Sequence, residues 1–169
     1  VAPATDAGVL RIMASDVTVE GFKFVAIGNK TVRITDPTSN VTIQNNHIVG
    51  AANTALAGTF TLLETDYNET QTDHVITGNI FEAHDAAQAV YYNPITPGLT
   101  FTDNTFTGTI KDGGVGVVVD ALSGTYAISG NNFTALGGDP YGMMGLPGLT
   151  PAQMDAVFLA NTFPAGYSV

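Results

Sequence analysis

Residues 126–133 read YAISGNNF, and close variants of this octapeptide return along the whole chain. The other copies are VTVEGFKF, VTIQNNHI, HVITGNIF, LTFTDNTF and AVFLANTF, which begin at residues 17, 41, 74, 99 and 156. The copies follow one another with a period of about 25 residues, and such a period is the sequence signature of repeat proteins. Six copies in 169 residues therefore predict a solenoid in which each repeat adds one rung.

Apolar and other residues alternate within each copy. In the fifth copy the large residues Tyr126, Ile128 and Phe133 are separated by Ala127, Ser129 and a polar bend. Alternation with a period of two is typical of a strand with one buried face. The equivalent residues of successive copies should therefore form inward columns, and the last such column reads Phe24, Ile48, Phe81, Phe106, Phe133 and Phe163.

An asparagine precedes the final apolar residue by two positions in five of the six copies. The first copy has Phe22 at this place, and the others have Asn46, Asn79, Asn104, Asn131 and Asn161. If the rungs stack about 4.8 Å apart, each side-chain amide can donate to the next and accept from the previous one. Because an unpaired buried polar group costs about 1–3 kcal/mol, we expect a structural asparagine ladder.

A second apolar segment follows four of the copies, at residues 31–35, 59–64, 89–92 and 115–119, and each leads into a turn. In this order of strand, asparagine bend, arch, strand and turn, residues 9–163 resemble the right-handed parallel β-helix of the pectin-lyase-like superfamily. The resemblance implies an all-β solenoid of about six rungs, a single domain over residues 1–169, with rungs beginning near residues 17, 41, 74, 99, 126 and 156.

The stretch from residue 135 to residue 156 departs from the repeat, and we expect it to replace the arch and second strand of its rung. Thr150, Pro151 and Gln153 have the spacing of a capping box with proline at the first helical position. This predicts a short helix near residues 150–156, followed by a last strand. Met143 and Met144 stand among glycines, and they should either pack on a flank of the solenoid or contact another chain.

The composition limits the partners. Fifteen acidic residues against five basic ones give a net charge of -10, which disfavours nucleic acid. No apolar run approaches the roughly 20 residues of a membrane span, and cysteine is absent, so a disulfide framework is excluded. The chain begins at Val1, for which we expect processing of a secreted or cell-surface protein, or excision from a longer one.

The resemblance implies that an enzyme of this architecture would carry clustered carboxylates and a basic residue on one outer strand face. The residues that could serve in this alternative are Asp36, Asp120 and Arg33. However, the chain contains no Gly-His-Gly or Arg-Ile-Lys sequence, and Asp is also favoured where strands turn. We therefore assign no catalytic residues.

The densest acidic stretch lies at residues 64–73. Glu64, Asp66 and Asp73 are candidate calcium ligands, but the spacing is not that of an EF-hand loop, and a solvated arch explains the stretch equally. We expect no other cofactor.

Two functions remain open. The first is a structural or adhesive module that associates end to end or belongs to a longer solenoid, because the last copy should be an uncovered edge strand. Its interface should include Val157, Leu159 and Phe163, together with Met143 and Met144, and should bury at least about 1,000 Å². The alternative is a carbohydrate-active module, a lyase, a hydrolase or a glycan binder, that contacts polysaccharide through Tyr67, Tyr91 or Tyr92.

Overall fold

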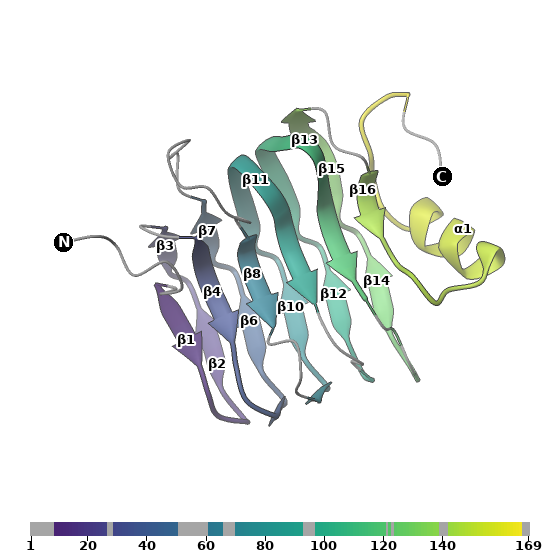
Figure 1. Cartoon of the computed structure of the whole chain (residues 1–169). Helices are drawn as coiled ribbons and strands as arrows, with labels where there is room; N and C mark the ends of the chain where they lie inside the picture. Colours follow the sequence, from purple (N-terminus) through teal and green to yellow (C-terminus); the bar gives the residue numbers. More distant parts are fainter. Residues whose placement is uncertain are drawn as a thin grey trace.

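The computed structural model describes residues 9–26, 29–50, 61–65, 70–92, 97–120, 122, 124–138 and 142–166. Within them the chain is an all-β parallel solenoid with one short helix, and the strands stack like rungs along one axis (Figure 1). Every strand pair is parallel, as the spacing of the copies predicts. The fold class expected from the sequence is thus confirmed.

One layer is built by the copies themselves. The order of its five short strands is β14 (Ala127–Ser129), β12 (Thr100–Thr102), β10 (Val75–Thr77), β6 (Thr42–Gln44) and β2 (Thr18–Glu20). The register places the middle residue of each copy beside its counterpart, from Val19 through Ile43, Ile76 and Phe101 to Ile128. All five are buried, so the inward column is confirmed.

A larger layer of nine strands closes the solenoid. Its main path runs β1 (Leu10–Ile12), β4 (Lys30–Ile34), β8 (Thr61–Thr65), β11 (Ile80–Tyr92), β13 (Thr105–Val119) and β15 (Asn132–Gly138). Strand β7 (His47–Val49) pairs with β11, β3 (Lys23–Val25) pairs with β7, and β16 (Gly142–Gly145) pairs with β13. A small third sheet consists of β5 (Thr38–Ser39) and β9 (Gln71–Thr72).

The solenoid has about four turns rather than the six rungs expected. Five copies form the strands of the five-stranded layer, and four turns connect them. The stretch from residue 135 also departs from expectation, because its Gly142–Gly145 segment forms strand β16 and so supplies a second strand to the fifth copy.

The first half of the sixth copy is helical. Helix α1 (Pro151–Leu159) includes Val157 to Leu159, so the strand predicted for these residues is wrong. Its start is as predicted: Thr150 and Gln153 form the capping box, and Pro151 is the first helical residue. Ala, Gln, Met and Leu favour a helix once it is nucleated, and the repeat resumes only afterwards, where Thr162 bridges to Asn132.

The phenylalanines of the last inward column form one continuous stack. The ring centroids are 5.1 Å apart between Phe81 and Phe106, 4.4 Å between Phe106 and Phe133, and 5.0 Å between Phe133 and Phe163. The stack ends on Phe158 of α1, 4.6 Å from Phe163, with nearly parallel rings. Helix α1 thus continues the core beyond the last rung.

In the first five copies the residue before the ladder position has a positive φ, and glycine alternates there with Asn or Asp along the stack, whereas Ala160 before Asn161 has φ -83°. The column reads Gly21, Asn45, Gly78, Asp103 and Gly130. The Asp103 Oδ1 atom lies 2.2 Å from the place that a Cβ at residue 130 would take, and Asn45 Oδ1 lies 2.7 Å from the equivalent place at residue 78. Glycine is therefore required above each of these polar side chains for space as well as for backbone conformation.

Candidate functional site

The asparagine ladder runs without interruption through the bend between the two large layers. Each Nδ2 donates to the Oδ1 of the next asparagine, at 3.1 Å from Asn46 to Asn79, 3.0 Å from Asn79 to Asn104, 2.9 Å from Asn104 to Asn131 and 2.8 Å from Asn131 to Asn161. The first four residues are buried. Since every one of these amides also bonds to backbone, the ladder holds structure together and leaves no amide for catalysis.

The ladder has a direction, and its two ends make different hydrogen bonds. The hydrogen bonds between the asparagine side chains all run toward the C-terminal end, where Asn161 Nδ2 donates to the carbonyl oxygen of Val157 at 2.6 Å. That carbonyl belongs to the last turn of α1, the negative end of the helix dipole. At the other end, Asn46 Oδ1 accepts from the backbone N–H of Phe22 at 3.0 Å. The helix thus supplies the acceptor that a further rung would supply.

Asp36 and Asp120, the carboxylates considered for catalysis, are not brought together. They follow strands β4 and β13, which are three strand spacings apart in the sheet, or on the order of 14 Å. Paired carboxylates of glycosidases lie only about 5–9.5 Å apart. Asp120 accepts a hydrogen bond from the Tyr91 hydroxyl at 2.6 Å, and Asp36 has φ 68°, which suits its turn. Arg33 lies on β4, beside Glu64 in the register.

Of the acidic stretch at residues 64–73, the structure describes the acidic residues Glu64 and Asp73, and their surroundings differ. Glu64 is buried and pairs with Lys30 Nζ at 2.5 Å, whereas Asp73 has φ 55° at a turn. Asp66 lies outside the described residues. Across the part of the chain that the structure describes, no three acidic or histidine side chains are placed to hold a metal ion.

Tyr92 and His74 belong to the core. The Tyr92 hydroxyl lies 3.0 Å from His74 Nδ1, and His74 Nε2 lies 3.2 Å from Thr38 Oγ1. Burial lowers the pKa of His74 to about 4, and burial raises that of Tyr92. Tyr92 therefore offers no surface for a sugar, and Tyr67 lies outside the described residues.

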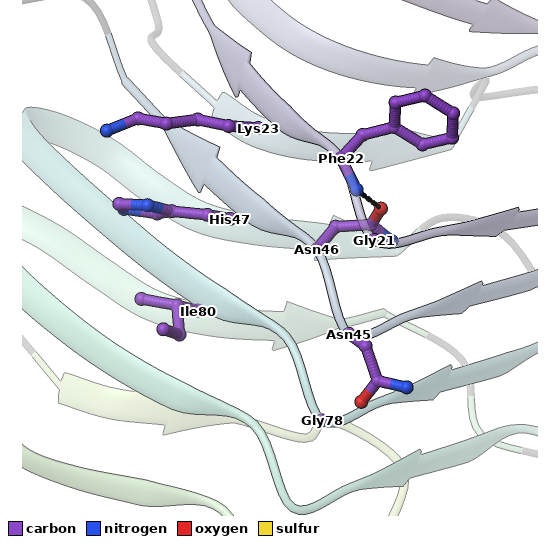
Figure 2. A pocket seen from close by; sticks show the side chains of 8 residues that line it. All are labelled: Gly21, Phe22, Lys23, Asn45, Asn46, His47, Gly78 and Ile80. Atoms are coloured by element: carbon purple, nitrogen blue, oxygen red, sulfur yellow. Dashed lines mark hydrogen bonds between the residues drawn. The ribbon is translucent and has the colours of Figure 1, made fainter.

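A shallow pocket of about 320 Å³ opens at the first asparagine bend (Figure 2). We call it the first-bend pocket. Its lining residues are Gly21, Phe22, Lys23, Asn45, Asn46, His47, Gly78 and Ile80. Lys23, His47 and Ile80 are register neighbours on β3, β7 and β11, and Figure 2 shows their side chains pointing the same way. The Phe22 side chain is 58% exposed, so the pocket combines an apolar ring with a cation.

Beside this pocket, one carboxylate contacts two imidazoles. His47 Nε2 lies 2.8 Å from Glu82 Oε2, and His84 Nε2 lies 3.1 Å from Glu82 Oε1. The hydrogen bond from His47 lowers the pKa of Glu82. The sequence predictions did not include this cluster. Aligning the copies places His47, just before Ile48, on the rung next to Glu82, just after Phe81, but it does not give the contact between their side chains.

The residues proposed for a C-terminal interface differ in their surroundings. Val157 is buried, Phe163 is half-buried in the aromatic stack, and Leu159 is 83% exposed. Met144 on β16 packs partly against the core, and the Met143 side chain lies outside the described residues. The expected uncovered edge at the sixth copy is therefore replaced by a helical cap, and Leu159 alone of the described candidates is broadly exposed.

Comparisons with protein-family models, curated proteins and solved structures find no match to this chain. In the described part of the chain, no helix is long and apolar enough to span a membrane.

Proposed function

We propose that this chain is a structural or adhesive β-solenoid module of a secreted or cell-surface protein. The observation that carries this proposal is the continuous asparagine ladder together with the parallel aromatic stack, because these two features make both the polar and the apolar interior rigid. A solenoid of this kind presents outer surfaces that are stacked at a regular spacing, and it needs few flexible loops to do so. The separation of Asp36 from Asp120 supports the proposal, because it leaves the alternative catalytic set unassembled.

The alternative that this chain is an enzyme is tested by measuring the turnover of polysaccharide substrates. Purified protein is incubated with pectate, alginate and neutral glucans, and unsaturated products are followed by ultraviolet absorbance and new reducing ends by colorimetry. We expect no product with any substrate. Turnover that is lost in Asp120→Asn, while the Thr134→Ala variant keeps it, would replace the structural proposal by an enzymatic one.

A second candidate function is the binding of a carboxylated saccharide at the first-bend pocket. It is favoured by the exposed Phe22 ring and by Lys23 and His47, which line the same pocket although the ring points to the opposite side from the two basic side chains (Figure 2), since a ring stacks on sugar C–H groups and the cation pairs with carboxylate. Titration calorimetry with oligogalacturonate tests it, with Lys23→Ala as the variant and Lys111→Ala as the matched control. Binding that is unchanged in Lys23→Ala contradicts this candidate.

We also propose that the solenoid winds right-handed, as in the pectin-lyase-like superfamily. Right-handed crossovers account for roughly 98% of parallel connections within one sheet. An experimental structure tests this directly, and a left-handed turn would set the chain apart from that superfamily.

A further inference from the structure

Exposed apolar side chains gather on the first rung. Among the described residues, six large hydrophobic side chains are exposed, and four of them lie between residues 9 and 25: Val9, Met13, Phe22 and Val25. Their exposed fractions are 43%, 56%, 58% and 51%. Such a concentration on one end of a molecule is typical of an interaction surface rather than of scattered surface residues.

Among the described residues, the core is also less covered at this end. The inward residues Leu10 and Phe24 are half-buried, whereas their register partners in the next rung, Val32 and Ile48, are fully buried. Strands β1, β2 and β3 each pair with one strand only among the described residues. Their outer edges therefore offer backbone groups to a further strand.

The distribution of charged residues along the chain favours a second copy of this chain as the partner. Residues 1–50 contain four basic residues (Arg11, Lys23, Lys30 and Arg33) and four acidic ones (Asp6, Asp16, Glu20 and Asp36), so their net charge is zero. The whole charge of -10 consequently falls on residues 51–169. Two copies that meet through their N-terminal ends bring neutral surfaces together and keep the acidic parts far apart.

We propose that the first rung is an interface with a second copy of this chain, joined N-terminal end to N-terminal end about a two-fold axis. The axis makes edge strands of the two copies antiparallel, a pairing that sheet edges accept readily. A head-to-tail filament is disfavoured because α1 and Phe163 cover the other end. This inference names the partner for the proposed structural role, and that role stands without it.

The first test is the mass in solution, by sedimentation over a wide concentration range. We expect a dimer that Met13→Glu with Val25→Glu weakens by at least about tenfold, with unchanged circular dichroism. Neither residue lines the first-bend pocket. Leu159→Glu, at a more exposed residue of the opposite end, is the matched control and should dimerise normally. A wild-type monomer at all concentrations, or a dimer lost only in Leu159→Glu, overturns the proposal.

A second measurement tests the same interface without relying on the folding of the charged variants. The chain lacks cysteine, so single spin labels can be placed at Ala14→Cys on the first rung and at Leu159→Cys on the cap. In the dimer, the label pair at residue 14 should be close and the pair at residue 159 distant. Equal distances for the two positions, or a short distance at residue 159 alone, contradict an N-terminal interface. Neither experiment depends on catalysis, so its failure leaves the turnover result unaffected.

Discussion

The two ends of the solenoid are built from copies of the same repeat but differ in how the repeat stops. At the C-terminal end the sixth copy becomes helix α1, which accepts the last ladder hydrogen bond and ends the phenylalanine stack. At the N-terminal end the first copy replaces the ladder asparagine by Phe22, which is exposed. A change of secondary structure thus closes the C-terminal end, whereas among the described residues the preserved strands β1, β2 and β3 leave the N-terminal end less covered.

The largest expected effect comes from removing the ring that joins the last rung to the cap. Phe133 is fully buried between Phe106 and Phe163, so Phe133→Ala should lower the free energy of unfolding by about 3–5 kcal/mol. Phe24→Ala, at the half-buried opposite end, should cost only about 1–2 kcal/mol. Urea denaturation of both variants at low protein concentration measures the two losses in the free energy of unfolding. Equal losses would mean that the first rung is as well covered as the last.

The middle of the solenoid, unlike its ends, should control acid stability. His74 has a pKa of about 4 when folded, against about 6.5 in the unfolded chain, so below pH 6.5 the unfolded state binds the extra proton. The free energy of unfolding should therefore fall from pH 6.5 to pH 4, by at most about 3 kcal/mol. Urea melts against pH test this, and His74→Gln should flatten the slope. A slope unchanged in His74→Gln would assign acid sensitivity to carboxylates.

The ladder should also be strongest in its middle. Asn104→Ala should cost about 1–3 kcal/mol, because it leaves the backbone N–H of Asn79 without its acceptor in a buried bend and removes one hydrogen bond each from Asn79 Nδ2 and Asn131 Oδ1. Asn161→Ala, at the partly buried capped end, should cost less. Asp36→Ala, at a turn, should cost under about 1 kcal/mol. Chemical denaturation of the three variants gives the order, and a reversed order would show that water enters the bend.

The smallest effect is expected on the outer surface of the cap. Leu159 is 83% exposed, so Leu159→Glu should change the free energy of unfolding by no more than about 0.5 kcal/mol. Val157→Asp, two residues away and buried, should in contrast release the cap. Hydrogen exchange distinguishes the two: faster exchange in α1 is expected for Val157→Asp alone. Release of the cap by Leu159→Glu would show that another surface covers this residue.

Much of the fold follows from the sequence, since the columns and the ladder repeat at fixed positions. The inward residues Ile76, Phe101 and Ile128 and the ladder asparagines were identified correctly because period two and the 25-residue repeat reinforce one another. The strand predicted for the sixth copy is wrong for a physical reason. Its alternation predicts a strand, but the capping box at Thr150 nucleates a helix that runs through Val157 and Leu159.

The candidate site could be predicted only in part. Outward placement of His47 followed from the repeat, but its contact with Glu82 depends on the register between β7 and β11 and on the side-chain conformations. The separation of Asp36 from Asp120 follows from the rung number of each residue. The exposure of Phe22 depends on what lies beyond the first rung, and no local pattern of residues indicates it.

The direction of the ladder bears on how chains of this kind can change in length. Each asparagine accepts from the rung before and donates to the rung after, so an extra repeat copied in tandem between Asn79 and Asn104 would restore both hydrogen bonds with its own amide. Duplication in register is therefore structurally neutral in the bend, whereas an inverted or half-length insertion would place two donors or two acceptors face to face. The solenoid can grow or shrink by whole repeats while keeping its first rung and its helix.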